Sequence, residues 1–411
     1  MTPVESAIRD FVREHAGAET RFLAEIVKVP SDNPPGDCNR AAEVVAALLE
    51  GLGLKVERHK VPEGLVKANG MISATNLIAK RRFREGPTIA LNAHGDVVPP
   101  GTGWAHDPYG GGIVDGWLYG RGAAVSKSDI ATYAFAMLAL EKCGAALNGA
   151  VELHVTYDEE AGGEIGPRYL LENGLSRPDL AIGAGFSYAV VNAHNGALHL
   201  EVEVLGRSAH AARPWTGVDA LEAANTILTA LYGWLGGLSA RTSAIPGIGS
   251  PQMTIGLIAG GINTNVVPDR VTFRLDRRIV PEEKPAEVEA ELRAVIARAA
   301  ALHSDARAKV TITRILLAEP LTPTPAGAKL TEILCRQASR VMGETIAASG
   351  VPLYTDARHY AKAGVPIVLY GAGPRTIEEA NAHRADERLP LSDLYKATEV
   401  IALTLAELLG A

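Results

Sequence analysis

The chain contains 411 residues, more than a single domain usually holds, so we expect two domains. Hydrophobic residues make up 47% of the sequence and charged residues 21%, which is typical of a globular protein with a sizeable core. The 47 acidic and 40 basic side chains give a net charge of −7 and are mixed along the chain, which argues against a nucleic-acid-binding protein.

Targeting and membrane signals do not stand out. The sequence starts with MTPVESAIRDFVREH, which has the pattern of a charged amphipathic helix and lacks the apolar stretch of a signal peptide. No apolar run reaches the roughly 18 residues that span a bilayer, so we expect no membrane partner. Cys38, Cys143 and Cys335 are few, odd in number and far apart, which suits a reducing compartment. We therefore predict a cytoplasmic protein.

Helix and strand patterns alternate through the first 190 residues. They predict a helix over residues 40–54, a strand over 87–98, a helix over 130–144 and a strand over 150–160. Strands that alternate with helices predict an α/β fold with a mainly parallel central sheet flanked by helices. Ligands of such sheets bind beyond the carboxyl ends of the strands, where the polar clusters 94–96 and 158–160 fall.

The pattern changes near residue 194. Two period-two strand patterns (197–206 and 271–280) and two helix patterns (218–235 and 282–302) follow in this segment. They predict a compact α+β unit, residues 194–309, inserted into a first domain formed by residues 1–193 and 310–411. After residue 310 the alternation of helices and strands returns.

The two polar clusters at strand ends are candidates for a metal site. His94 and Asp96 point to the same side of their strand, which suits a pair of side chains around a metal ion. Glu159 and Glu160 are adjacent and point in different directions. One can bind a metal while the other acts as a general base on a substrate water. Taken alone, each cluster is also consistent with a solvated polar turn.

Three later segments offer further polar side chains. His210 follows the first strand pattern of the inserted unit, and His383 lies in the polar loop AHRADE. NTNVVPDRVTFRLDRR carries Asn265 and the arginines Arg277 and Arg278, and an arginine can hold a substrate carboxylate with two hydrogen bonds. Each of these residues alone is equally consistent with a solvated surface.

Together these motifs resemble the M20 metallopeptidase family, which includes acetylornithine deacetylase, succinyl-diaminopimelate desuccinylase, aminoacylase and glutamate carboxypeptidase. The matching segments are, in order, LNAHGDVVP, GWAHDPYGGGIVDGWLYGRGA, VTYDEEAGG, GRSAHAARPWTGVDA, NVVPDRVTFRLDRR and YTDARHYAKAGVPIVLYGAG. The resemblance covers nearly the whole chain. It implies a catalytic domain with an inserted lid, a small-molecule substrate and a homodimer formed through the lid. An exposed edge strand at 197–206 would be consistent with lid pairing.

The resemblance also implies a role for each candidate residue around the metal ions. His94 would bind one metal ion, and Asp96 would orient that histidine from behind. Glu160 and His383 would bind a second ion. Glu159 would be the general base that takes a proton from the attacking water and passes it to the leaving nitrogen.

The inserted unit would supply the remaining roles. His210, reaching across from the partner's lid, would stabilise the oxyanion. Asn265 and Arg278 would hold the substrate, with Arg278 facing its carboxylate. The predicted reaction is hydrolysis of the amide C–N bond of a small N-acyl amino acid.

Two positions depart from the family pattern. In YGRGAAVSKSD the slot of the acid that bridges two metals holds Val125, which has no lone pair to offer. A second acid should follow the glutamate pair by some two dozen residues, and the corresponding run AIGAGFS places Ala184 there. Without a bridging anion two close cations repel each other, so we predict that no ordinary two-metal site forms.

Three readings follow from this loss, and we predict the first. In the first, one zinc ion persists on His94, Glu160 and His383, a set of two histidines and one carboxylate that zinc hydrolases use. Asp129 or Asp96 would then add an oxygen.

The other two readings need no metal. In the second, Glu159 works with His94, His210 and either Ser126 or Lys127 in acid–base chemistry on an amino-acid-like substrate, such as elimination, isomerisation or ring opening. In the third, the chain is a non-catalytic binding protein on the same scaffold.

Overall fold

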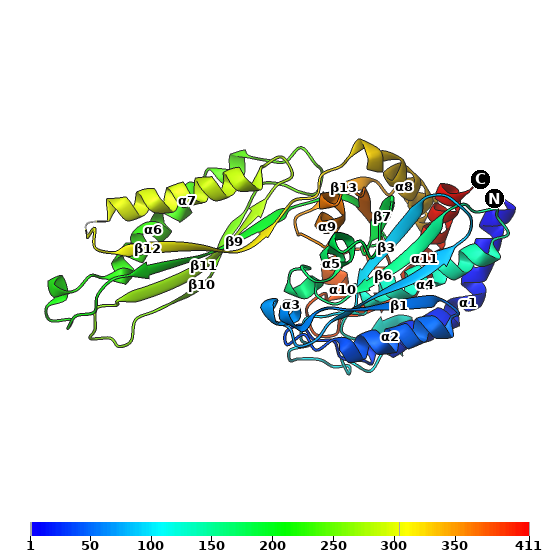
Figure 1. The fold of residues 1–411 in the computed structure, drawn as a ribbon, viewed down its shortest axis with the longest axis horizontal. Coiled ribbons are helices and arrows are strands. Elements are labelled where there is room, and N and C mark those ends of the chain that lie inside the picture. The colour runs from blue at the N-terminus through cyan, green and yellow to red at the C-terminus, as the bar shows by residue number, and fades with distance from the viewer. Residues whose placement is uncertain (1, 304, 411) are drawn as a thin grey trace. The chain divides into compact units, whose positions relative to one another are not determined.

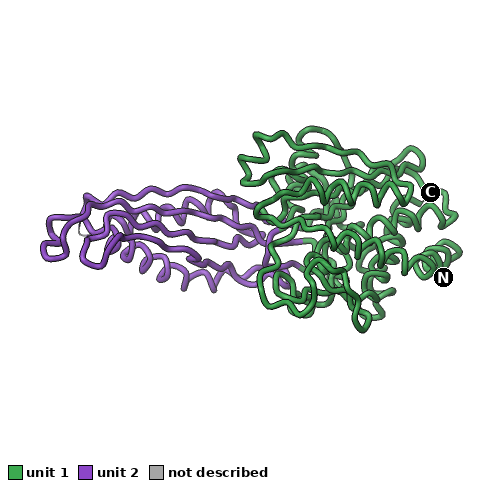
Figure 2. The backbone as a smooth tube through the Cα atoms, turned by 90° about the horizontal axis from the view of Figure 1, so that it is seen from below, with its two compact units in different colours: residues 1–192, 323–349, 355–411 green, residues 193–322, 350–354 purple. Residues whose placement is uncertain are grey.

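The computed structural model describes residues 2–303 and 305–410. The chain divides into two compact units, shown in different colours in Figure 2. Unit 1 consists of residues 1–192, 323–349 and 355–411, and unit 2 of residues 193–322 and 350–354.

Unit 2 extends further along the chain than the sequence pattern indicates. The predicted boundary after residue 309 falls inside the structure of this unit, because β12 (Lys309–Ala318) pairs antiparallel with β9 (Gly196–Leu205) along its length. Residues 350–354 join the same unit, where the Gly350 N–H donates to the Pro246 carbonyl (2.8 Å).

The core of unit 1 is an eight-stranded sheet (Figure 1). Its strands are, in spatial order, β1 (Lys55–Lys60), β2 (Thr75–Arg82), β6 (Ala150–Thr156), β3 (Thr88–His94), β7 (Leu180–Gly183), β14 (Ile367–Leu369), β8 (Val190–His194) and β13 (Ala348–Val351). The central run β6-β3-β7-β14 is parallel. β1 pairs antiparallel with β2, β2 with β6, and β8 with β14. This arrangement confirms the predicted α/β class.

Helices surround the sheet of unit 1. They are α1 (Pro3–Val27), α2 (Asn39–Gly51), α3 (Glu63–Ala68), α4 (Lys127–Lys142), α5 (Pro167–Glu172), α8 (Ala328–Met342), α9 (Ala357–Lys362), α10 (Ile377–Ala380) and α11 (Leu391–Leu409). The alanine-rich α4 favours a helix and is buried along nearly its whole length, because it packs against α1, α11 and the strands β3 and β6. A small sheet of β15 (Arg388–Pro390), β5 (Trp117–Tyr119) and β4 (Gly112–Val114) completes the unit.

Unit 2 is an antiparallel four-stranded sheet in the order β10 (Met253–Gly260), β11 (Arg270–Ile279), β9, β12, with the helices α6 (Ala220–Leu235) and α7 (Pro285–Leu302). Alternate residues of β9, Leu198, Leu200, Val202 and Val204, are buried in a core shared with these helices. Since β9 lies between β11 and β12, the expectation that residues 197–206 form an edge strand is wrong. The edges are β10 and β12.

Among the described residues, no helix combines the length and the apolar character that crossing a bilayer requires.

Candidate metal centre

Two neighbouring strands of the eight-stranded sheet end at the candidate site. The strands β3 and β6 are parallel, and His94 at the end of β3 pairs in register with Thr156 at the end of β6. Because parallel strands present their carboxyl ends at the same edge of a sheet, the segments that follow them lie side by side. These segments are the polar clusters 94–96 and 158–160 of the sequence.

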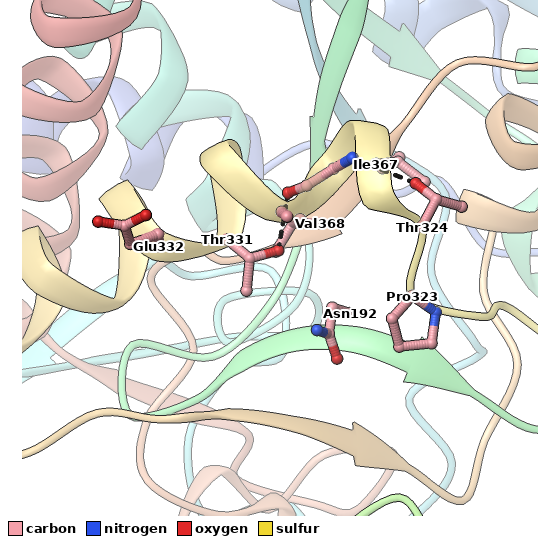
Figure 3. A pocket seen from close by; sticks show the side chains of 9 residues that line it. Asn192, Pro323, Thr324, Thr331, Glu332, Ile367 and Val368 are labelled. Carbon is pink, nitrogen blue, oxygen red and sulfur yellow. Dashed lines mark hydrogen bonds between the residues drawn. The ribbon is translucent and has the colours of Figure 1, made fainter.

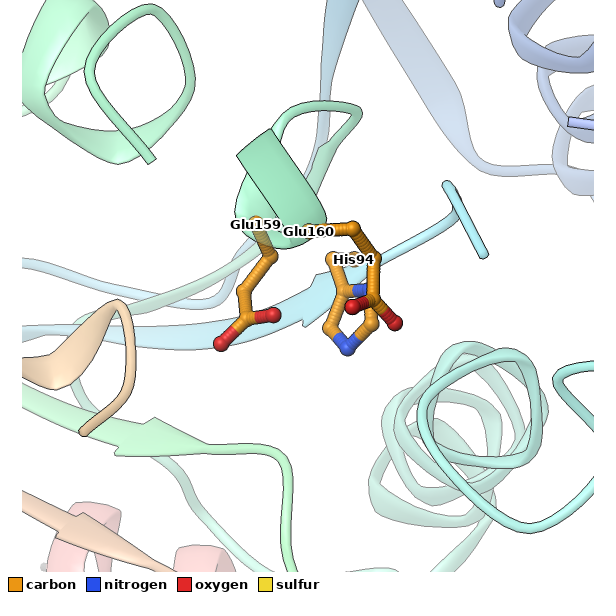
Figure 4. Close-up of side chains that lie close together, drawn as sticks. All are labelled: His94, Glu159 and Glu160. Atoms are coloured by element: carbon orange, nitrogen blue, oxygen red, sulfur yellow. The ribbon is translucent and has the colours of Figure 1, made fainter. Parts of the chain in front are cut away.

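Three side chains converge there. Of the residues that the structure describes, His94, Glu159 and Glu160 are the one group of three or more possible metal ligands whose donor atoms all lie within 4.8 Å of one another. Both glutamates come from the short 3₁₀ helix η1 (Glu159–Ala161), and the Glu160 carboxylate lies beside the His94 imidazole (Figure 4). An imidazole nitrogen and carboxylate oxygens are ligands that zinc accepts.

Asp96 holds both halves of this group in place. Its buried carboxylate accepts hydrogen bonds from the backbone N–H groups of Glu159 (3.3 Å) and Glu160 (3.1 Å) and from Nδ2 of Asn33 (3.0 Å). The Nδ1 atom of His94 lies 3.0 Å from the Asp96 carbonyl oxygen and 3.4 Å from a carboxylate oxygen. Asp96 thus contacts both glutamates as well as His94, and Asn33, which the sequence analysis misses, contacts Asp96 in turn.

His383 lies next to Glu160 on a loop of unusual backbone conformation. Its Nε2 atom is 3.4 Å from Oε1 of Glu160, although it is outside the group of three. Asn381, His383 and Asp386 all have positive φ values (51°, 61° and 56°), which L-residues rarely adopt. Such strain in one short loop is typical of functional sites.

A buried ion pair fixes that loop to the segment that carries Val125. The Arg121 guanidinium lies 2.7 Å from a Glu387 carboxylate oxygen, and both side chains are almost fully buried. The other oxygen of Glu387 accepts the N–H of Ala124 (3.1 Å). Breaking a buried pair by removing one partner costs about 3–5 kcal/mol, so this contact is a firm structural link.

Comparisons with known proteins identify the family. The model of peptidase family M20/M25/M40 matches residues 90–407. The chain belongs to this family.

Relatives agree with that assignment over most of the chain. Succinyl-diaminopimelate desuccinylase of Gluconacetobacter diazotrophicus is 28% identical, with 94% of this chain and 96% of the relative covered. Acetylornithine deacetylase of Myxococcus xanthus is 30% identical, with 89% and 90% covered. The crystal structure of human carnosine dipeptidase 1 shares the fold, with a TM-score of 0.76, 19% identity and 99% of each chain covered. As an M20 enzyme, the protein is an amidohydrolase that acts on amino-acid-like substrates.

The loop that carries Val125 faces the protein interior. Ser126 accepts the backbone N–H of His94 on its hydroxyl oxygen (3.1 Å). The buried Lys127 donates to the Val29 carbonyl (2.9 Å), and burial lowers its pKa to about 8. The first-turn residue Asp129 is also buried and accepts the N–H of Ala372 (2.8 Å). These side chains serve the framework, and Asp129 is not part of the donor group.

Ala184, the other position that the sequence analysis compares with a metal-binding acid, supplies no donor side chain either. It follows β7, and its N–H donates to the Asn92 carbonyl (2.8 Å), which continues the sheet. In the described part of the chain, His94, Glu159 and Glu160 thus remain the one group of three or more possible metal ligands.

Negative charge accumulates around that cluster. Burial, reinforced by the charges of Glu160 and Asp96 and opposed by that of His94, raises the pKa of Glu159 to about 7. Burial and the charge of Asp356 raise the pKa of Asp158 well above its usual range. Burial opposes the charge on His94 too, but the Asp96 hydrogen bond and the neighbouring acids still raise its pKa. A cation placed here would offset these costs.

The predicted residues of the lid lie in unit 2. The exposed segments that carry His210 and Asn265 are joined by a hydrogen bond from the Ala211 N–H to the Asn265 carbonyl (3.0 Å). Arg278 lies on β11 and is paired with Asp276. Its neighbour Arg277 is fully buried.

A cavity of about 300 Å³ lies elsewhere in unit 1 (Figure 3). Its lining includes Asn192, Thr324, Thr331 and Ile367, and it shares no residue with the donor group.

Proposed function

We propose that the protein hydrolyses the amide C–N bond of small, carboxylate-bearing N-acyl amino acids at a site that binds one divalent cation, most naturally zinc. The observation that carries this proposal is the convergence of His94, Glu159 and Glu160 at the ends of β3 and β6. Val125 and Ala184, in the slots of two further acids, account for one cation in place of two.

The charge of the site fits a single cation. The His94 imidazole and the carboxylate of Glu160 offer one nitrogen and one oxygen ligand, and His383 is close enough to Glu160 for a small movement of its exposed side chain to complete the set. A second divalent ion would need its own anionic ligands, and no other cluster of donors exists among the described residues.

Different residues of the site carry out different parts of the proposed reaction. A bound zinc ion would supply Lewis acidity toward the amide carbonyl. Glu159 takes the proton of the attacking water and passes it to the leaving nitrogen, and its pKa of about 7 suits both steps. Asp96 keeps Glu159 and Glu160 in register through their backbone N–H groups.

His210 is suited to stabilising the oxyanion. Its Nδ1 atom accepts the backbone N–H of Ala212 (3.1 Å), so the neutral ring carries its proton on Nε2 and presents it as a donor. We propose that this donor comes from the lid of a partner subunit. Asn265 contacts the substrate, and Arg278, which shares its guanidinium with Asp276, makes a secondary contact.

The dimer that this requires would form through unit 2. Its edge strand β10 exposes Leu257 and Ile258, and Ile262 just beyond the strand is 78% exposed. An exposed apolar edge invites pairing with a second strand, so we propose that β10 of two copies meet. We place the enzyme in the cytoplasm, because its cysteines are free and two of them are buried.

Metal-independent acid–base chemistry on an amino-acid-like substrate is the second candidate. The observation that favours it is the raised pKa of Glu159, since a general base with a pKa near 7 works at neutral pH without a cation.

Turnover with and without metal decides between the two. N-acetyl and N-succinyl amino acids are offered to the enzyme purified without added metal, after chelation, and after zinc is returned. We expect hydrolysis that chelation abolishes and zinc restores. Amide hydrolysis that is indifferent to chelator would refute the cation site, and the absence of amide hydrolysis under all three conditions would refute the proposed reaction.

A further inference from the structure

The arginine that the family resemblance assigns to the substrate carboxylate already has an acidic partner. The Nε and Nη2 atoms of Arg278 lie 3.1 and 3.0 Å from one carboxylate oxygen of Asp276, two residues away on the same face of β11. The guanidinium carbon also lies 5.7 Å from the centre of the Tyr354 ring. A substrate carboxylate that approaches Arg278 therefore meets a nearly neutral pair, with two of the donor nitrogens in use.

A second arginine is placed beside His210 without such a partner. The backbone N–H of Arg213 donates to the His210 carbonyl (2.8 Å), which closes a four-residue turn. The Arg213 side chain is exposed and makes no hydrogen bond or ion pair with any other described residue. Most other arginines of unit 2 are paired with an acid: Arg241, Arg270, Arg274, Arg277, Arg278, Arg293, Arg307 and Arg314.

The loop that presents Arg213 is held at both ends. Arg207 and Val218 exchange two backbone hydrogen bonds (2.9 and 2.8 Å) at its base. Within the loop, the Thr216 hydroxyl donates to the Arg213 carbonyl (2.8 Å). Gly217 lies so close to the Arg207 carbonyl that an added Cβ would come within 2.7 Å of that oxygen, so the packing requires a glycine. A loop fixed in this way loses little entropy when a ligand binds.

The same loop carries an uncovered aromatic ring. Trp215 is 73% exposed and stacks on no ring or cation among the described residues. The other three tryptophans each lie under an arginine: Trp104 under Arg121, Trp117 under Arg388 and Trp234 under Arg277. The loop thus offers an imidazole N–H, a guanidinium and an apolar ring within six residues of the sequence.

From this arrangement we infer that Arg213 binds the carboxylate of the substrate, while Arg278 mainly supports the sheet face next to it. The inference rests on the proposed function, because it takes the ligand to be an N-acyl amino acid that His210 also contacts. The guanidinium of Arg213 has its donors free for two hydrogen bonds to one carboxylate, which is the geometry that arginine favours. Arg213 lies near any substrate that His210 contacts, because one backbone turn joins the two residues.

The test compares a carboxylate with its neutral analogue. The best substrate from a panel of N-acetyl-L-amino acids and the α-carboxamide of the same compound are given to wild type, Arg213→Gln and Arg278→Gln. Arg274→Gln, an exposed arginine paired with Glu201 on the same unit, is the matched control. We expect Arg213→Gln to lower kcat/KM about 10- to 100-fold for the carboxylate and little for the carboxamide. Arg278→Gln should change the ratio of the two kcat/KM values less.

The outcomes separate this inference from the proposed reaction. The role of Arg213 would be overturned if Arg213→Gln kept the wild-type ratio of kcat/KM between carboxylate and carboxamide. It would also be overturned if this ratio fell only in Arg278→Gln. If wild type turns over no member of the panel, the proposed hydrolysis fails. The inference is then tested by equilibrium binding of N-acetyl-L-ornithine and its α-carboxamide to the same variants. The ratio of their two dissociation constants takes the place of the kcat/KM ratio. Equal unfolding temperatures of the variants exclude misfolding as the cause of a change.

Discussion

Replacing Glu160 by glutamine should change stability in opposite directions at low and high pH. The donor atoms of Glu159 and Glu160 lie within 4.8 Å of each other. Two unit charges at that separation repel each other by about 3.5 kcal/mol at an effective dielectric constant of about 20. Because both side chains are partly exposed to solvent, we expect about 1–3 kcal/mol of this repulsion to be felt.

The sign of the stability change at each pH follows from the pKa of Glu159. Burial and nearby acids raise it from 4.5 to about 7 in the folded protein, so ionisation of Glu159 costs native stability as pH rises from about 4.5 to about 7. At pH 9 Glu159 is charged, and Glu160→Gln relieves the repulsion between the two side chains. At pH 5.5 Glu159 holds its proton. The substitution then only removes the hydrogen bond and charge of Glu160, which raise the pKa of His383.

Urea unfolding in the presence of a chelator measures both effects. We expect Glu160→Gln to be more stable than wild type at pH 9 by about 1–3 kcal/mol and less stable at pH 5.5. In a second series without chelator, added zinc should stabilise wild type and leave the variant nearly unchanged. Glu172→Gln, which loses only a surface ion pair with Arg168, is the control and should shift stability by less than about 1 kcal/mol. A variant that is destabilised at both pH values, or that keeps the full zinc response, would refute the reasoning.

Four further predictions concern the site and the proposed dimer. Glu159→Gln should lower kcat about 10²- to 10⁴-fold while bound metal per chain, measured by elemental analysis, stays the same. Asp96→Asn should weaken zinc binding about 10- to 100-fold in calorimetric titration, because three N–H donors lose their charged acceptor. Zinc affinity should rise about tenfold per pH unit between pH 6 and 7, since the proton on His94, whose pKa is raised, competes with the cation; a flat profile would count against His94 as a ligand. If two copies pair through β10 as proposed, wild type should have the mass of a dimer in light scattering and Ile258→Lys that of a monomer; an unchanged mass would remove β10 from the interface.

The strand-end clusters could be predicted because their signal is local. An apolar strand that ends in HGD or DEE places those side chains at a sheet edge, and the parallel pairing of β3 and β6 brings them together as expected. The sequence also predicts the inserted unit, because β9 and β11 alternate with period two while central strands of the first domain, such as β3 and β6, are buried on both faces.

Longer-range pairings could not be predicted in the same way. The sequence of β12 does not tell which sheet this strand joins, so the sequence analysis ends the inserted unit at residue 309, before the strand. Nothing local in SDNPPG shows that Asn33 donates to Asp96, 63 positions away. The ion pair between Arg278 and Asp276 could have been predicted, since residues two positions apart on a strand share one face.

Metal content per chain tests the central claim most directly. The enzyme is purified without chelator or added metal, dialysed against zinc at pH 8, washed and analysed for metal and protein. The single cluster formed by His94, Glu159 and Glu160 predicts about one zinc per chain, lost in Glu160→Gln. Two per chain would mean that further ligands replace Val125 and Ala184. None per chain would contradict the cation site and favour metal-independent chemistry led by Glu159.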